Sequence, residues 1–155
     1  EIDEGLVGSE MCIRDSGLGV DGSASNDSGH MLNEARQAML LQRVMKTGDA
    51  LTARQSLAIA TRGGAAVLGR DDIGQLAPGY AADIAAFDCR GIDFAGAAWD
   101  LLAGLLFCGS TTTSYTIING KIIVDQGHLV TMDMPKLLEN HHAMTADLMR
   151  KAQWA

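Results

Sequence analysis

The sequence has little of what marks an exported, membrane-spanning or nucleic-acid-binding protein. Its three cysteines, Cys12, Cys89 and Cys108, are odd in number and widely spaced, with no Cys-x-x-Cys pair, so no disulfide framework is predicted. Twelve lysines and arginines against 19 aspartates and glutamates give a net charge of −7, which disfavours a phosphate backbone as partner. The longest apolar stretch, residues 95–108, contains Asp100 and is shorter than the roughly 20 residues of a membrane-spanning helix. We expect a soluble, cytoplasmic protein with no nucleic-acid or membrane partner.

The first 16 residues have no clear periodicity and no export signal. Within them, the stretch GLVGSEMCIRDS resembles a translated sequencing adapter of the kind found at the ends of proteins predicted from metagenomic assemblies. We therefore interpret residues 1–16 as a non-native leader, the alternative being a native loop. In the first case the natural chain was cut just before Gly17 and began further upstream.

A chain of 155 residues accommodates about one domain, and a hydrophobic content of 47% with 20% charged residues permits a packed core. Helical periodicity is found in three segments, and a fourth helix is predicted to begin near Asp133. The three helical segments are 31–45, 52–61 and 95–107, and the predicted strands are 17–21, 82–88, 115–118, 121–124 and 128–130.

Local signals support several of these boundaries. Thr52 and Gln55 have the spacing of a capping box, and the glycine pair 63–64 is predicted to interrupt the helix that they open. Pro78-Gly79 fits the centre of a type II turn, because proline presets one dihedral angle and glycine accepts a positive φ. Asn119-Gly120 predicts a two-residue hairpin turn, in which both residues need positive φ.

Asp21 is the strongest candidate for a residue that carries chemistry. It follows a short apolar run and precedes small residues, which would let a ligand approach a carboxylate at the C-terminal end of a parallel strand. The alternative is an aspartate that caps the following loop through its backbone. The pattern alone leaves both interpretations open.

Other candidates are weaker. His30 lies near the start of a predicted helix and is expected to be solvated, as are Asp71 and Asp72 before a turn. The sequence has no His-x-His or His-Glu-x-x-His motif, so this chain alone is not expected to assemble a metal site of three or four ligands. The spacing Gly-x-Gly-x-x-Gly at residues 17–22 falls within a strand and opens no helix, which disfavours a dinucleotide site.

Three segments resemble a known family. The segment 17–43, GLGVDGSASNDSGHMLNEARQAMLLQR, is similar to the region around the last barrel strand of metal-dependent amidohydrolases of the aminohydrolase and chlorohydrolase branch. Residues 56–88 resemble the family's exit from the barrel, with the pattern Ile-Gly-x-Leu-x-x-Gly-x-x-Ala-Asp-Ile. Residues 118–121 match the hairpin of its small β domain. The greatest similarity is to bacterial 8-oxoguanine deaminases, through residues 21–27 and 34–38.

The resemblance implies an α/β protein, namely a C-terminal fragment of a (β/α)8 TIM barrel with part of a small β-sandwich domain. Residues 17–70 would supply the last strand and helices of the barrel. Residues 71–131 would be mainly the β-sandwich domain with an intervening helix, and 132–155 a C-terminal helix. The chain by itself is expected to be inactive and to expose apolar helix faces.

The resemblance also implies a site. Asp21 would be both a ligand of a divalent metal, zinc in the first instance, and the carboxylate that moves a proton. The other ligands, a His-x-His pair and further histidines, and a catalytic glutamate would lie upstream. Ser23, Ser25 and Asn26 are candidates for lining the substrate pocket, the alternative being residues that shape the loop. A homo-oligomer is compatible with these features.

The implied reaction is hydrolysis of an exocyclic amino group on a purine-like base of the 8-oxoguanine type, with release of ammonia. One alternative is a triazine or another amino-heterocycle as substrate. The other is a non-catalytic α+β binding or assembly module.

Overall fold

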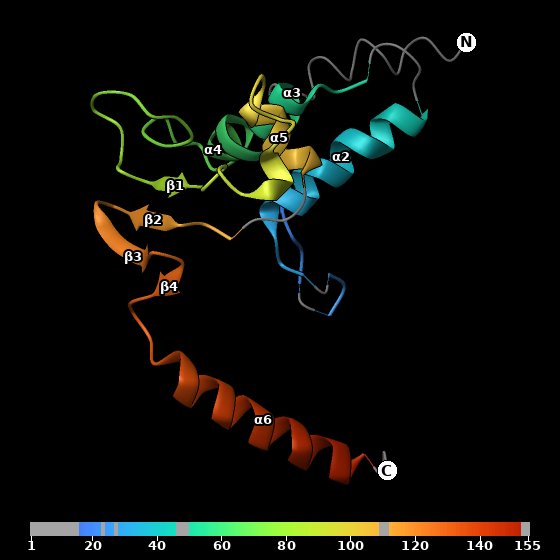
Figure 1. Ribbon diagram of the computed structural model, residues 1–155, viewed down its shortest axis with the longest axis vertical. Helices are drawn as coiled ribbons and strands as arrows, with labels where there is room; N and C mark the ends of the chain where they lie inside the picture. Colours follow the sequence, from blue (N-terminus) through green and yellow to red (C-terminus); the bar gives the residue numbers. More distant parts are fainter. Residues whose placement is uncertain (1–15, 23, 27, 46–49, 109–111, 153–155) are drawn as a thin grey trace.

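The computed structural model describes residues 16–22, 24–26, 28–45, 50–108 and 112–152. In Figure 1 the helices α2 to α5 lie together on one side of a small sheet, and α6 extends away from it. The helical elements are α2 (Met31–Met45), α3 (Ala53–Ala58), the π-helix η1 (Ile59–Gly63), α4 (Gly64–Val67), the 3-10 helix η2 (Ile92–Phe94), α5 (Leu101–Phe107) and α6 (Met134–Lys151). The strands are β1 (Ile84–Ala86), β2 (Tyr115–Ile118), β3 (Lys121–Asp125) and β4 (His128–Leu129).

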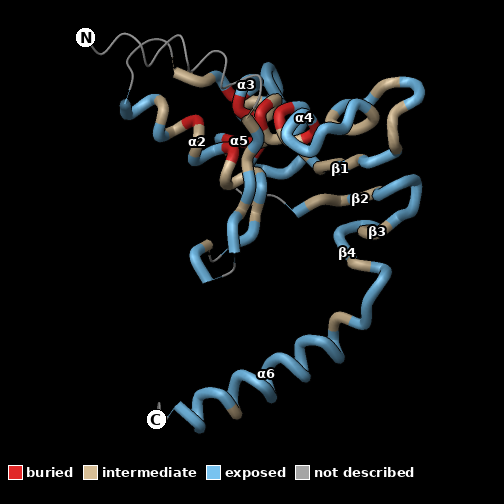
Figure 2. The backbone as a smooth tube through the Cα atoms, turned by 180° about the vertical axis from the view of Figure 1, so that it is seen from behind, coloured by how far each residue is buried: buried red, intermediate tan, exposed pale blue. Residues whose placement is uncertain are grey.

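The core lies where α2, α3 and α5 meet (Figure 2). Its buried members are Ala35, Met39, Ala53 and Leu106. Leu18 packs against this cluster from the segment that precedes Asp21. The fully buried hydroxyl of Ser56 donates a hydrogen bond to the carbonyl of Ala35, so the one buried polar side chain among the described residues is satisfied. The core therefore fixes α2 against α3 and holds the approach to Asp21.

The segment before Asp21 crosses the helical layer at the adjacent glycines Gly63 and Gly64. A Cβ atom at Gly63 would lie less than 3.0 Å from the carbonyl oxygen of Ser16, and one at Gly17 would lie 3.0 Å from the Cα of Gly64. The two backbones approach so closely because Gly17, Gly63 and Gly64 carry no side chain. These contacts hold the beginning of the segment that leads to Asp21.

The predicted buried strand at 17–21 is wrong for this chain. The segment has no strand assignment, and its residues alternate between half-buried and exposed. An extended segment forms a ladder only when a neighbouring strand pairs with it, and none of the described residues does so. Leu18 accordingly gains its burial from the helical core and not from a sheet.

The helix that begins after Thr52 continues further than predicted. The capping box is present, with the Thr52 side chain accepting from the backbone N–H of Gln55 and the Gln55 side chain accepting from the backbone N–H of Thr52. The glycine pair does not interrupt the helix, which passes through the π-turn η1 into α4. It stops at Gly69, whose φ of +64° is suited to a helix C-terminus.

The third predicted helix, 95–107, begins later than expected. Residues 92–94 form η2, and α5 starts at Leu101 because the Asp100 carboxylate accepts the N–H of Ala103 and caps its first turn. Asp100 also forms a 3.2 Å ion pair with Arg54, which links the N-cap of α5 to the first turn of α3.

The four strands form an antiparallel meander in the order β1-β2-β3-β4. The Asn119-Gly120 hairpin is confirmed: both residues have positive φ, 49° and 75°, between β2 and β3. The Pro78-Gly79 turn is also confirmed, with a φ of +88° at Gly79 and a hydrogen bond from the Tyr80 N–H to the carbonyl of Ala77. The strand predicted at 82–88 is shorter than expected, at Ile84–Ala86.

Asp83 ties the start of β1 to this hairpin. Its carboxylate accepts the backbone N–H of Asn119 at 2.7 Å, and the neighbouring carbonyl of Ala82 accepts that of Gly120 at 3.1 Å. The Ala-Asp-Ile part of the sequence pattern therefore has a structural role, which is to hold the turn between β2 and β3 against the strand beside it.

We expect Asp83→Ala to lower the free energy of unfolding by about 1 kcal/mol, because the hairpin loses one hydrogen bond to a carboxylate. Denaturant unfolding measures the change. Asp83→Asn is the matched control, since its side-chain oxygen can still accept the Asn119 N–H. An equal loss in both variants would contradict the role of this hydrogen bond.

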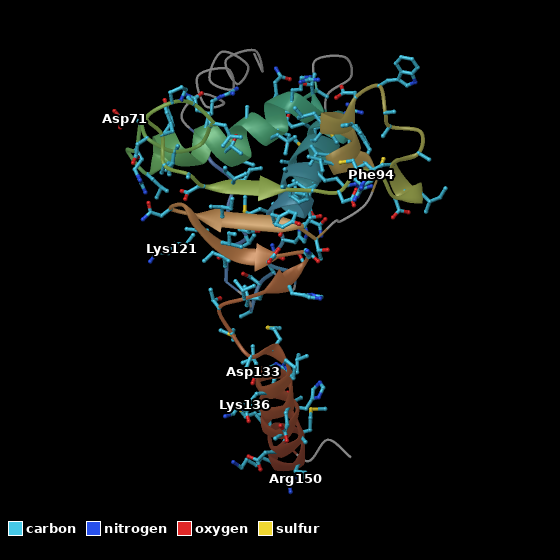
Figure 3. All side chains as sticks on the ribbon, turned by 60° about the vertical axis from the view of Figure 1, so that its left-hand side comes forward. Asp71, Phe94, Lys121, Asp133, Lys136 and Arg150 are labelled. Carbon is cyan, nitrogen blue, oxygen red and sulfur yellow. The ribbon has the colours of Figure 1, made fainter. Side chains whose placement is uncertain are left out.

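The last helix, α6, is confirmed near its predicted start. The Asp133 side chain accepts the N–H of Lys136, and Pro135 occupies the first turn. None of its residues is buried, and in Figure 3 its labelled residues Asp133, Lys136 and Arg150 mark a helix that projects from the sheet. Its exposed apolar side chains are Leu137, Leu138, Met144, Leu148 and Met149. The prediction of an uncovered apolar helix face is confirmed.

Candidate active site

Asp21 lies at the end of the segment that crosses the glycine pair, in a left-handed backbone conformation with φ +60°. Non-glycine residues adopt this conformation uncommonly, although aspartate does so more readily than most. The residue is exposed. Its side chain is therefore presented to solvent at the start of the loop that leads to α2.

Two hydrogen bonds hold the Asp21 carboxylate. The hydroxyl of Ser25 donates to Oδ2 at 2.9 Å, and the backbone N–H of Gly22 donates to Oδ1 at 2.8 Å. The Ser25 hydroxyl, and to a lesser degree the Gly22 N–H, hold the pKa of Asp21 below its ordinary value of 3.8 because both stabilise the charged form. At neutral pH the group is an ionised, oriented carboxylate. Both interpretations left open by the sequence are compatible with this geometry, since the carboxylate caps the loop and remains accessible.

The loop after Asp21 is closed on itself. The carbonyl of Gly22 accepts the backbone N–H groups of Ser25 and Asn26, each at 3.0 Å. The amide of Asn26 is engaged at both ends: its oxygen accepts the N–H of Ser28 at 3.2 Å and its nitrogen donates to Glu34 at 2.6 Å. Ser23, the third residue predicted to line the pocket, lies outside the described residues.

A groove of about 720 Å³ runs between this loop and α2. Ser25 and Asn26 line it from the loop, and Glu34 and Gln37 are among the residues that line it from the helix. Asp21 is not among its described lining residues. Ser25 is therefore the residue that touches both the groove and the Asp21 carboxylate.

His30, at the start of α2, differs from its predicted solvated state. The residue is half-buried, and its Nδ1 is enclosed with no hydrogen-bond partner among the residues that the structure describes. The carbonyl of the same residue accepts the N–H groups of Asn33 and Glu34, so the backbone is at the helix terminus and the ring is turned inward.

The two acids expected to be solvated behave differently. Asp71 is exposed at one end of the helical layer (Figure 3). Asp72 is half-buried and accepts two hydrogen bonds from the Arg70 guanidinium, at 2.8 and 2.6 Å. Arg70 accordingly lowers the pKa of Asp72. Both oxygens of Asp72 are thus engaged by Arg70, so Asp72 is not a free carboxylate.

Of the side chains around this loop, Asp21 is the one proposed as a metal ligand. Asp21 offers an exposed, ionised carboxylate, which is a suitable ligand for a divalent ion. Among the residues that the structure describes, no group of three or more His, Cys, Asp or Glu side chains is placed to hold a metal ion. Asp21 therefore fits a metal site as one ligand of a larger set.

Among the described residues, no helix has both the length and the hydrophobicity to span a bilayer.

The chain is similar to known proteins over most of its length. The profile described as "Amidohydrolase family" matches residues 4–123. The chain is 42% identical to the 8-oxoguanine deaminase of Pseudomonas aeruginosa over 132 residues, which are 85% of this chain and 29% of that protein. It is 40% identical to a 5-methylthioadenosine/S-adenosylhomocysteine deaminase of Pelotomaculum thermopropionicum, over 79% of this chain and 28% of that protein.

The chain is also similar to a solved structure. The atrazine chlorohydrolase TrzN from Arthrobacter aurescens TC1, complexed with zinc, is 38% identical to the chain and superposes with a TM-score of 0.73. The match covers 79% of this chain and 28% of the chlorohydrolase. The chain thus spans less than a third of the length of the proteins that it matches.

Proposed function

The chain belongs to the amidohydrolase family, and from this premise we propose that it is the C-terminal part of a metal-dependent aminohydrolase that removes an exocyclic amino group from a purine-like base as ammonia. The predicted fold class is confirmed, since the solved structures that it resembles are amidohydrolases with a TIM barrel. One observation of the structure carries the proposal. The exposed Asp21 carboxylate accepts hydrogen bonds from Ser25 and Gly22 and lies at the start of a loop of small residues.

The Asp21 carboxylate has the properties of a proton carrier. It is accessible, and its two hydrogen bonds leave lone pairs free on both oxygens. In the proposed reaction it takes a proton from the attacking water and passes it to the departing nitrogen, so that the product leaves as ammonia. A divalent metal ion such as zinc supplies, when bound, a water that is acidic enough to react at neutral pH. The hydrogen bond from Ser25 orients the carboxylate for both proton transfers.

The substrate class is proposed from the relatives. The 8-oxoguanine deaminase and the 5-methylthioadenosine/S-adenosylhomocysteine deaminase are named for purine compounds. Direct contacts of Ser23, Ser25 and Asn26 with the base stay predictions. For Asn26, the two hydrogen bonds of its side chain within the loop favour the loop-shaping role.

A triazine is the second candidate substrate, because the chain is also similar to the triazine-degrading chlorohydrolase TrzN. The non-catalytic module is not proposed further, since the family that matches residues 4–123 consists of hydrolases.

Substrate profiling of the full-length enzyme tests the proposal. We expect ammonia release from 8-oxoguanine to exceed that from 5-methylthioadenosine, and no release from amino-triazines, when the zinc-loaded enzyme is assayed with each at equal concentration. Turnover of triazines without turnover of any purine would replace the purine assignment by the second candidate. Failure to release ammonia from every one of these compounds would overturn the aminohydrolase itself.

Two further features are proposed with this function. The division at residues 70 and 131 into barrel, mainly β-sandwich with an intervening helix, and C-terminal helix stays a proposal; the intervening helix α5 lies in the middle segment and packs against α2 and α3 of the first. Of the segment interpreted as a leader from the sequence, residues 1–15 lie outside the described residues. A cytoplasmic location is supported by Cys89 and Cys108, which are both free thiols, as a reducing compartment requires.

A further inference from the structure

We propose that Glu34, in the first turn of α2, is a positioning residue that sets the orientation of Asp21 through Asn26 and the loop between them. This inference rests on the proposed function, in which Asp21 is the reacting carboxylate. It gives Glu34 a role that acts from a helix on a side chain thirteen positions earlier in the chain. Three linked contacts carry it.

The first contact joins the helix to the loop. The Nδ2 group of Asn26 donates to Oε1 of Glu34 at 2.6 Å, and both residues are half-buried. Hydrogen bonds to a carboxylate are shorter and stronger than those between neutral groups. The helix that bears Glu34 is itself anchored, because the next residue, Ala35, is fully buried in the core. Asn26 is therefore tied to the rigid part of the molecule.

The second contact set makes the loop a unit around Asn26. Its side-chain oxygen accepts the N–H of Ser28 at 3.2 Å, and its backbone N–H donates to the carbonyl of Gly22 at 3.0 Å. The same carbonyl accepts the N–H of Ser25 at 3.0 Å. Holding Asn26 therefore also holds Gly22 and Ser25, which are the two residues that donate hydrogen bonds to Asp21.

The third contact transmits this position to the carboxylate. The Ser25 hydroxyl lies 2.9 Å from Oδ2 of Asp21 and 3.1 Å from the carbonyl of Gly22, so it bridges the reacting group and the loop backbone. Asp21 is exposed and its φ of +60° is sparsely populated for a residue with a side chain. A residue in such a conformation keeps it only when its surroundings determine it, and here the closed loop does so.

A second role for Glu34 must be separated from this one. A carboxylate in the first turn of a helix is stabilised by the helix dipole, so Glu34 would favour α2 even without acting on Asp21. That role predicts a loss of stability alone. The positioning role predicts a loss of catalysis and of metal affinity in an enzyme that remains folded.

The test uses the full-length enzyme with the variants Glu34→Ala, Glu34→Gln, Asn26→Ala and the double variant Glu34→Ala/Asn26→Ala. We expect Glu34→Ala and Asn26→Ala each to lower kcat and the affinity for zinc, measured by competition with a chelator, by about 10- to 100-fold. Glu34→Gln should stay close to the parent, because its amide oxygen can accept the same hydrogen bond from Asn26. The double variant should lose no more than either single variant, since both break one link.

The control is Glu139→Ala, which removes an exposed carboxylate from α6 and should change neither quantity. Amide hydrogen exchange of the metal-free protein gives a readout independent of activity, and we expect faster exchange at residues 22–28 in Glu34→Ala. Should Glu34→Ala fail to fold, Asn26→Ala breaks the same contact from the loop without changing the helix.

Either of two results would overturn the inference. One is a Glu34→Ala enzyme with reduced thermal stability but unchanged kcat, zinc affinity and loop exchange. The other is an equal loss in Glu34→Gln and Glu34→Ala. In both cases an inactive Asp21→Asn variant would leave the proposed function intact, so the two failures are distinguishable.

Discussion

Replacing Asp21 by asparagine in the full-length enzyme is expected to lower kcat by about a thousandfold, because an amide cannot take a proton from the attacking water or return it to the leaving nitrogen. The fold should be unchanged. Asparagine tolerates the left-handed conformation of this position, and its oxygen can still accept the hydrogen bond from Ser25. Ammonia release under saturating substrate measures kcat, and circular dichroism checks the fold.

Asp71→Asn is the matched control for this change. Asp71 is also an exposed aspartate, but it lies at the end of the helical layer. We expect that variant to have the activity of the parent. An Asp21→Asn enzyme with parental activity would contradict the role given to this carboxylate, whatever the zinc content of the variant.

The second large effect is expected at Gly63. We expect Gly63→Ala to lower the free energy of unfolding by about 3 kcal/mol, at the upper end of the usual cost of overpacking. The added Cβ would lie less than 3.0 Å from the carbonyl oxygen of Ser16, and a backbone carbonyl cannot rotate away as a flexible side chain can. Because the contact is to the backbone, it does not depend on which side chain occupies position 16. Denaturant unfolding of the full-length enzyme measures the change.

Gly64→Ala provides a control one position along the chain. A Cβ at Gly64 meets nothing within 4 Å among the described residues. Alanine is a better helix former than glycine by about 1 kcal/mol, so this variant should be at least as stable as the parent. A Gly63→Ala enzyme as stable as the Gly64→Ala enzyme would show that the segment before Asp21 does not cross the helix at this glycine pair.

Features specified by neighbouring residues could be predicted from the sequence. The helix at Met31–Met45, the capping box at Thr52 and the Asn119-Gly120 hairpin depend on local side chains and on the φ values that those residues allow. The strand at 17–21 could not be predicted correctly, because strand formation depends on a partner that the described residues do not supply. The late start of α5 had a local signal, the cap residue Asp100, which helical periodicity alone does not detect.

The candidate site also combines features set by neighbouring residues with features that depend on residues further along the chain. Asp21 is a candidate because of a local pattern, an acid after an apolar run and before small residues. The contact between Asn26 and Glu34 spans eight positions and depends on how the loop folds back on α2, which no spacing rule specifies. An asparagine in a loop followed by a glutamate in the next helix turn is a signal that could have suggested such a tether.

Since no residue of α6 is buried, detaching this helix from the sheet breaks no contact of the core. A protease that cut the chain at 130–133 would release a peptide that contains the 18-residue amphipathic helix α6 and would leave the packing of α2, α3 and α5 as it is. Released in water, such a peptide has no tertiary packing, from which most of the stability of helices in proteins comes. The helical content of this part of the chain is thus the property most sensitive to whatever covers its apolar side.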